Sequence, residues 1–128
     1  MNSEFEKIGV VGAGAWGTAL ALNAHRAGRK VRIWARETQI AEDLTAGRGN
    51  PRYFDGVEMP AVPASTDLSD IAACDAIMMV TPAQHMREVL VSLKGEVRAD
   101  ASILLCSKGV EQGTLKLMTE VLADVLPE

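Results

Sequence analysis

The sequence has few of the residues that build disulfides or metal sites. It contains two cysteines, Cys74 and Cys106, which lie far apart in the chain and form no Cys-x-x-Cys pair. This spacing favours buried free thiols over a disulfide or a thiolate metal site. The two histidines, His25 and His85, have no histidine or cysteine three or four residues away. No metal site is therefore predicted.

A basic surface and a membrane-spanning segment are also lacking. Thirteen Lys and Arg against seventeen Asp and Glu give a formal net charge of -4, and no basic run is long enough to bind nucleic acid or a lipid surface. No apolar run approaches the length of a membrane span, and residues 1–7 do not begin a secretion signal. The sequence therefore predicts a cytoplasmic protein with no nucleic-acid partner and no membrane span.

What the sequence does contain is enough apolar side chains for one core. The chain has 128 residues, of which 48% are hydrophobic, and this suits one domain. Apolar runs rich in β-branched residues predict strands over residues 5–11, 30–35, 62–65, 75–82 and 101–106. Helical spacing predicts helices over residues 18–27, 38–46, 83–93 and 114–126. Strands alternating with helices are typical of an α/β doubly wound parallel sheet.

A glycine-rich turn joins the first predicted strand to the first predicted helix. The segment from Gly12 to Gly17 reads Gly-Ala-Gly-Ala-Trp-Gly, a G-x-G-x-x-G pattern. In such a turn Gly12 permits the tight bend, Gly14 lets the backbone approach a pyrophosphate, and Gly17 lets the helix lie close to the strand. The free N–H groups and the helix dipole then face the phosphates. Strand, turn and helix together predict a Rossmann-like dinucleotide-binding domain.

Trp16 lies inside this turn, and its role is open from the sequence. An indole at this position either covers a bound cofactor or packs on the core at the start of the helix.

The end of the second predicted strand bears on the choice of cofactor. It reads Trp34-Ala35-Arg36-Glu37. An arginine here accommodates the 2′-phosphate of NADP, whereas an acidic residue hydrogen-bonds the ribose 2′-hydroxyl of NAD. Glu37 has the spacing of the NAD-type acid, but it also suits the first turn of the helix over residues 38–46. We prefer Arg36, so the sequence favours NADP over NAD.

Two further strand ends carry candidate residues. Pro82 ends the predicted strand over residues 75–82, near the point where ligands of open α/β sheets bind. Lys108 follows the strand over residues 101–106 and precedes a glycine, which suits a lysine that faces a phosphate or a carbonyl.

The motifs in this order resemble one family. The glycine turn, Trp34-Ala35-Arg36, Asn50 with Tyr53, Ser65-Thr66-Asp67, Val80-Thr81-Pro82 and Ser107-Lys108-Gly109 together look like the amino-terminal domain of bacterial NAD(P)-dependent glycerol-3-phosphate dehydrogenase. The resemblance runs almost the whole length of the chain. It implies an oxidoreductase that interconverts dihydroxyacetone phosphate and sn-glycerol 3-phosphate by hydride transfer with NAD(P)H, in glycerophospholipid biosynthesis.

The resemblance also assigns roles to individual residues. Trp16, Arg36, Tyr53 and Lys108 fall on positions that contact NADPH in the family, and Lys108 falls on one that also contacts the substrate. An ammonium group can hold a phosphate or a developing alkoxide without donating the proton, so Lys108 is the candidate catalytic residue in this chain. The candidate cofactor-binding residues are Gly12, Gly14, Ala15, Trp16, Gly17, Arg36, Tyr53, Pro82 and Lys108.

Two departures from the family pattern shape the expectations. After Tyr53 the family continues Leu-Pro-Gly, whereas this sequence has Phe54-Asp55-Gly56. The chain ends at Glu128, before the family's next strand and before the helical substrate domain with its catalytic lysine. We therefore expect residues 1–128 to form an incomplete NAD(P)-binding domain that is inactive as a dehydrogenase alone. We also expect it to form a homo-oligomer through an exposed sheet edge.

Two alternatives remain at the level of sequence. One is a sensor or structural module that binds NAD(P) without catalysis, since the sequence offers no acid/base pair. The other is a different β-hydroxyacid or ketopantoate-type dehydrogenase, because these enzymes share the glycine turn and the parallel sheet.

Overall fold

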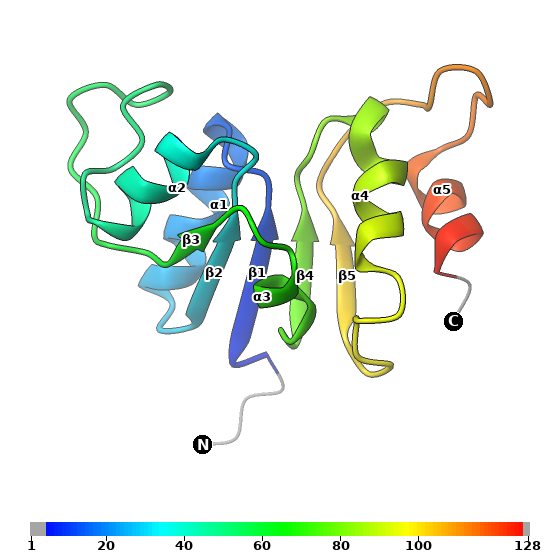
Figure 1. The fold of residues 1–128 in the computed structure, drawn as a ribbon, viewed down its shortest axis with the longest axis horizontal. Coiled ribbons are helices and arrows are strands. Elements are labelled where there is room, and N and C mark those ends of the chain that lie inside the picture. The colour runs from blue at the N-terminus through cyan, green and yellow to red at the C-terminus, as the bar shows by residue number, and fades with distance from the viewer. Residues whose placement is uncertain (1–4, 127–128) are drawn as a thin grey trace.

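The fold is a parallel sheet with helices on both faces (Figure 1). The computed structural model describes residues 5–126. The strands are β1 (Lys7–Val11), β2 (Lys30–Trp34), β3 (Ala64–Ser65), β4 (Ala76–Met79) and β5 (Ser102–Leu105). The helices are α1 (Ala15–Arg26), α2 (Thr38–Thr45), α3 (Ser69–Ala72), the 3₁₀ helix η1 (Ala83–His85), α4 (Met86–Leu93) and α5 (Met118–Val125). The strand order β3-β2-β1-β4-β5, parallel throughout, confirms the predicted doubly wound sheet.

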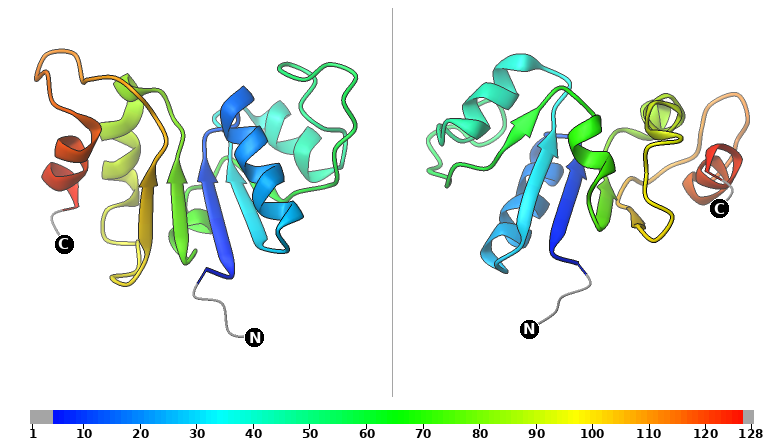
Figure 2. Two further views of the ribbon diagram at one scale, coloured as in Figure 1. Left: turned by 180° about the vertical axis from the view of Figure 1, so that it is seen from behind. Right: turned by 60° about the horizontal axis from the view of Figure 1, so that its bottom comes forward.

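The core lies in two layers, one on each face of the sheet. Successive side chains of a strand point to opposite faces, so β1 contributes to both layers. Ile8 and Val10 pack with residues of α1 and α2, whereas Val11 packs with residues of α3, α4 and α5. The two views of Figure 2 show α1 on one face and α3 on the other. All three β1 side chains are buried, which explains the short apolar run in the sequence.

The register aligns the carboxyl ends of the central strands. Val11, the last residue of β1, is paired with Trp34 at the end of β2 and with Met79 at the end of β4. The chain leaves β1 toward β2 on one side and returns to β4 on the other, so the strand order reverses at β1. Ligands of open α/β sheets bind at this switch point, outside the carboxyl ends of the strands.

The last helix is shorter than predicted. It begins at Met118, not at Thr114, and Leu115 is 75% exposed with a φ of 61°. The Thr114 hydroxyl donates to the Glu111 carboxylate at 2.6 Å and accepts from the N–H of Lys116 at 3.3 Å, within a turn that precedes the helix. An antiparallel bridge between Val110 and Leu117 closes the intervening residues into a turn.

Other expectations differ in smaller ways. The helix predicted over residues 83–93 is split into η1 and α4.

Both cysteines are free thiols, Cys74 buried and Cys106 partly buried, and burial raises the pKa of each. Within residues 5–126, no helix is long and apolar enough to cross a membrane, and no cluster of metal-ligating side chains is present. Residues 1–4, which belong to the segment predicted not to begin a secretion signal, lie outside the described residues.

Candidate functional site

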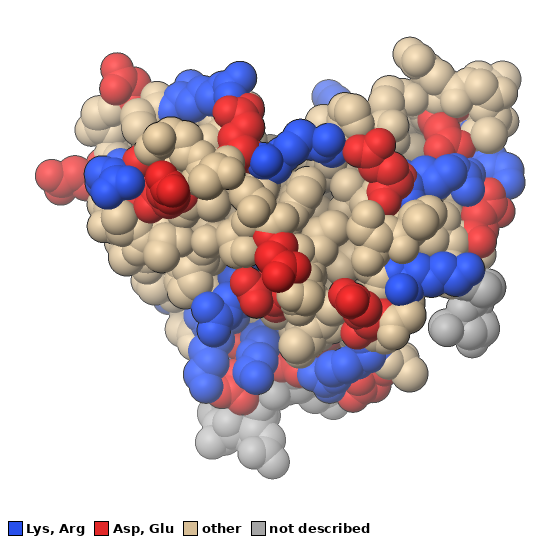
Figure 3. Space-filling view, viewed as in Figure 1, with Lys and Arg blue, Asp and Glu red and all other residues tan. Residues whose placement is uncertain are grey.

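A cavity of about 320 Å³ opens at the carboxyl ends of β1, β2 and β4. Its walls come from the glycine turn, the end of β2 and start of α2, the loop that contains Tyr53, and the end of β4. The lining residues are Gly12, Ala13, Gly14, Ala15, Trp16, Gly17, Trp34, Ala35, Arg36, Glu37, Ile40, Tyr53, Val80, Thr81 and Pro82. In Figure 3 the outline of the molecule is notched at this end of the sheet, and acidic and basic side chains are interspersed on the face drawn. Every predicted cofactor-binding residue except Lys108 lines this cavity.

Steric exclusion explains two of the three glycines. A Cβ on Gly17 would lie 1.9 Å from the carbonyl oxygen of Gly12, because α1 starts directly against the turn. Gly12 has a φ of +122°, and a Cβ there would lie 3.0 Å from the backbone of Val80. No other residue type fits either position without a shift of the backbone.

Gly14 is different, because the space above it is open. A Cβ on Gly14 would approach no atom closer than the Tyr53 ring, at 4.0 Å, and its φ of -77° is ordinary. The missing side chain therefore leaves room in the cavity instead of relieving a clash within the fold. A pyrophosphate that rests on this backbone would need that room.

The amino terminus of α1 points into the same cavity. Gly14 is the N-cap, no side chain caps the helix, and its first turn contains no acidic residue. The first-turn N–H groups carry the positive end of the helix dipole and have no partner inside the helix. Such a helix start binds anions, phosphate groups among them.

Asn50 ties the loop over residues 47–56 to the glycine turn. Its side chain is 1% exposed, and its Nδ2 donates to the carbonyl of Ala13 and to Oγ1 of Thr18, both at 2.9 Å. The backbone carbonyl of Asn50 accepts from the N–H of Tyr53 at 3.1 Å. Asn50 therefore holds the Tyr53 ring beside Gly14. The sequence flagged Asn50 only through the family resemblance, since an asparagine in a turn-rich loop carries no distinct pattern.

Two arginine–carboxylate pairs lie near the end of β2. Arg36 donates from Nη2 to Oε1 of Glu88 at 3.2 Å, and its guanidinium lies 5.8 Å from the centre of the Trp34 ring. The carboxylate of Glu37 pairs with Arg52. Glu37 is the N-cap residue of α2, one position before the predicted first turn, and its side chain makes no capping hydrogen bond. Neither pair could be predicted from a sequence pattern, because the partners lie 52 and 15 residues apart.

Lys108 lies outside this cavity, in an adjoining hollow. The hollow is about 780 Å³ and is lined by Trp16, Leu20, Leu105, Cys106, Ser107 and Lys108. Trp16 lines both spaces and is 60% exposed, so the alternative in which it packs into the core is wrong. The Ser107 hydroxyl donates to the carbonyl of Thr81, which ties the Lys108 loop to the end of β4.

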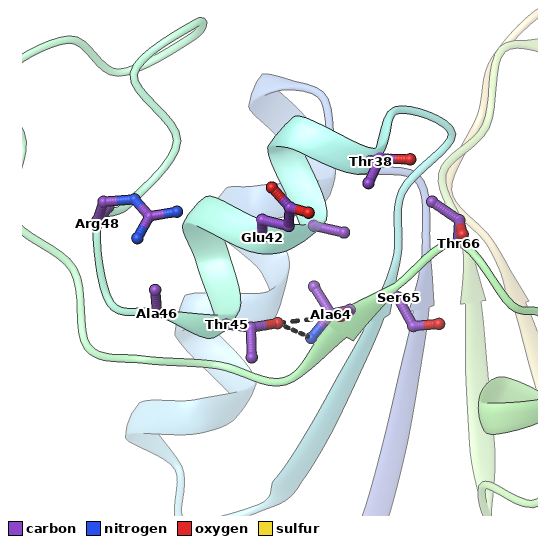
Figure 4. A pocket seen from close by; sticks show the side chains of 9 residues that line it. Thr38, Glu42, Thr45, Ala46, Arg48, Ala64, Ser65 and Thr66 are labelled. Atoms are coloured by element: carbon purple, nitrogen blue, oxygen red, sulfur yellow. Dashed lines mark hydrogen bonds between the residues drawn. The ribbon is translucent and has the colours of Figure 1, made fainter.

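A third hollow, of about 590 Å³, lies between α2 and β3 (Figure 4). It contains none of the predicted site residues. Thr45 lies at its base, where its hydroxyl accepts from the N–H of Ala64 and donates to the carbonyl of Ala64, both at 3.0 Å. These two groups face away from β2, whose hydrogen bonds go to Pro63 and Ser65 instead. Thr45 therefore occupies the outer edge of β3.

Comparison with known proteins agrees with this geometry. The family profile described as "NAD-dependent glycerol-3-phosphate dehydrogenase N-terminus" matches residues 7–128. A glycerol-3-phosphate dehydrogenase [NAD(P)+] from Caulobacter vibrioides is 50% identical over 124 residues, which cover 96% of this chain and 38% of the relative. The chain thus spans somewhat more than a third of the length of such relatives.

Solved structures show the same relationship. The crystal structure of glycerol-3-phosphate dehydrogenase from Coxiella burnetii is similar to this chain with a TM-score of 0.88 and 33% identity, over 98% of this chain and 39% of that one. A ketopantoate reductase from Ralstonia eutropha has a TM-score of 0.74 at 23% identity, over 94% of this chain and 38% of that one, which shows a shared fold alone. On the match over residues 7–128, the chain belongs to the NAD-dependent glycerol-3-phosphate dehydrogenase family, whose amino-terminal part it represents.

Proposed function

We propose that residues 1–128 form the NAD(P)-binding domain of an enzyme that interconverts dihydroxyacetone phosphate and sn-glycerol 3-phosphate. The observation that carries the proposal is the glycine turn with the uncapped start of α1 beside an open cavity. Family membership supports the reaction class, and the names of the relatives supply the substrate and the cofactor. The helical substrate domain belongs to the part of the relatives' length that this chain does not span.

In the proposed complex each wall of the cavity has one task. The N–H groups at the start of α1 bind the pyrophosphate above Gly14, and the Tyr53 ring covers it. Pro82 and Thr81, at the end of β4, form the wall toward the nicotinamide. The bound nicotinamide supplies or accepts the hydride. Trp16 separates this space from the hollow of Lys108, whose ammonium holds the phosphate or the developing alkoxide of the substrate.

Arg36 supports NADP as the preferred cofactor. Its guanidinium lines the cavity at the end of β2, where the 2′-phosphate of NADP lies in folds of this type. A guanidinium fork recognises a phosphate through two parallel hydrogen bonds. Glu37 is the competing NAD-type acid, but its carboxylate is already paired with Arg52. Because the charge of Arg52 offsets that of Glu37, Glu37 repels a 2′-phosphate less strongly.

The chain alone is expected to turn over little or no dihydroxyacetone phosphate. The hollow around Lys108 is lined by no carboxylic acid and no histidine among the described residues. Cys106 is a poor proton donor there, since burial raises the pKa of its thiol. Reduction of the ketone therefore lacks a positioned general acid.

Titration of the chain with NADPH and with NADH tests the proposal. Trp16 and Trp34 line the cavity, so their fluorescence reports occupancy. Saturable quenching by both cofactors, with the tighter binding for NADPH, is expected. If neither cofactor binds, the cavity is not a dinucleotide site and the proposal fails. Rapid turnover of dihydroxyacetone phosphate by the same sample would refute the assignment of the general acid to the substrate domain.

A further inference from the structure

The ion pair between Arg36, which lines the cavity, and Glu88 joins the end of β2 to α4. Arg36 follows β2, and Glu88 lies in the first turn of α4, which follows β4. These two strands flank β1 on opposite sides, so the pair joins elements from the two sides of the switch point of the sheet. The Nη2–Oε1 distance is 3.2 Å, and both side chains are more than half exposed. A pair in water of this kind is weak and can exchange partners.

Glu88 places a negative charge beside the cation assigned to the 2′-phosphate. One oxygen of the carboxylate occupies a donor of the same guanidinium that the phosphate would use. A phosphate group must therefore displace this carboxylate or bind beside it, and like charges repel in either case. A ribose 2′-hydroxyl meets no such repulsion, and it can donate a hydrogen bond to a carboxylate.

Glu88 also has a histidine within reach. Nδ1 of His85 lies 3.7 Å from Oε1 of Glu88, the oxygen that accepts from Arg36. Arg36 in turn lies 5.8 Å from the centre of the Trp34 ring, a contact that does not involve Glu88. Each member of the pair therefore has a neighbour besides the other.

We propose that Glu88 is a specificity-determining residue, which weakens binding of the 2′-phosphorylated dinucleotide and so lets one cavity accept both NADP and NAD. This inference rests on the proposed function and adds a residue of α4 to the cofactor site. Glu88 stands outside the glycine turn and the end of β2, where cofactor choice is usually sought.

Glu88→Gln tests the inference. The substitution removes the charge and keeps the size of the side chain. For charges about 6 Å apart in water at physiological salt, the dissociation constant of NADPH should fall by about three- to tenfold. The dissociation constant of NADH should change less than about twofold, because NADH has no 2′-phosphate. The ratio of the two constants cancels any effect of Glu88 on the shared pyrophosphate or on the stability of α4.

Glu96→Gln is the matched control, with the same change in net charge. Glu96 is exposed just beyond the other end of α4, where its N–H donates to the carbonyl of Leu93. This variant should leave the NADPH to NADH ratio unchanged. The inference also requires that the gain from Glu88→Gln shrink as salt is raised.

The outcomes separate this inference from the proposed function. If the parent chain binds both cofactors and Glu88→Gln leaves their ratio unchanged, or if Glu96→Gln changes it equally, Glu88 has no role in specificity although the cofactor site stands. If the parent chain binds neither cofactor, the proposed function fails and this inference fails with it.

Discussion

The glycine turn and the end of β2 line the same cavity, but different forces fix them. At the turn, backbone contacts exclude side chains, with only 1.9 Å between a Cβ on Gly17 and the Gly12 oxygen. At the end of β2, Arg36 is held by an exposed pair with Glu88. Steric exclusion does not depend on salt concentration. An exposed ion pair is screened by salt and contributes only about 0–1 kcal/mol to stability. The rigid region therefore suits the pyrophosphate that all dinucleotides share, and the exchangeable region suits the 2′ position where they differ.

The largest effect is expected at Gly17. In Gly17→Ala the new Cβ meets backbone that cannot move without shifting α1 from β1. Overpacking of this kind costs about 1–3 kcal/mol or more, which outweighs the gain of about 1 kcal/mol from alanine in a helix. Urea unfolding should show the loss of stability, and cofactor titration should show loss of binding.

Gly14→Ala separates binding from folding at the same turn. Its Cβ enters open space 4.0 Å from the Tyr53 ring, so the unfolding midpoint should stay near that of the parent. The methyl group would occupy the pyrophosphate position, and affinity for both cofactors should fall by about tenfold or more. Unchanged affinity in Gly14→Ala would mean that the pyrophosphate does not rest on this turn.

Arg36→Ala tests the end of β2, which is held by the exposed ion pair. Loss of a bidentate contact to a 2′-phosphate should weaken NADPH binding by about one to two powers of ten. NADH binding should change less than about twofold, so the preference should disappear. Arg36→Lys, which keeps the charge but not the fork, should fall between the two. Equal losses for both cofactors would assign Arg36 a structural role instead.

Asn50 connects the rigid glycine turn to the loop over residues 47–56. Its substitution should have a smaller effect on stability than Gly17→Ala. Asn50→Leu removes both donors to Ala13 and Thr18 and leaves a buried carbonyl without its partner. The expected cost is about 1–2 kcal/mol in urea unfolding, with weaker binding because Tyr53 is no longer held. Asp55→Asn, an exposed change in the same loop, should stay within about 0.5 kcal/mol. A cost at Asp55 equal to that at Asn50 would argue against the anchor.

Low pH should weaken a segment that ion pairs hold in place and should leave the glycine turn, which steric contacts hold in place, unchanged. Hydrogen bonds from Arg87 lower the pKa of Glu111, and Lys116 together with Arg87 lowers that of Asp124. Their contribution is present above the usual carboxyl pKa and is lost as pH falls through the lowered values, below about pH 4. Hydrogen-exchange protection of residues 110–126 should then fall at pH 3. Protection of the Gly12 and Thr18 amides, which donate to the carbonyls of Trp34 and Gly14 at the glycine turn, should not fall, because the turn has no titratable side chain. An equal loss there would contradict the distinction.

The sequence predicted those features whose causes lie close together in the chain. The β-branched run of β1, the glycines after it and the helix that follows are local signals, and the strand order follows from alternation. The need for glycine at position 17 is also local, because the clash there is with the carbonyl oxygen of Gly12, whereas the close contact at Gly12 is with the backbone of the distant Val80.

The missed features depend on partners distant in sequence. The Glu88 partner of Arg36 lies 52 residues away, and no periodicity connects them. The predicted start of α5 is wrong because residues 110–117 form a turn that the Val110–Leu117 bridge closes, and Glu111 in that turn pairs with Arg87 from α4. A helix start is a local signal, but here contacts with a distant helix hold the preceding residues in a turn.

The hydroxyl of Thr45 protects one edge of the sheet. Within residues 5–126 the sheet has two outer edges, β3 and β5, and Thr45 occupies the edge of β3 at Ala64. A strand approaching from this side would find the N–H and the carbonyl of Ala64 already paired. A single side chain of α2 thus acts in place of a neighbouring strand, in the way that natural sheets cover their edges against unwanted pairing.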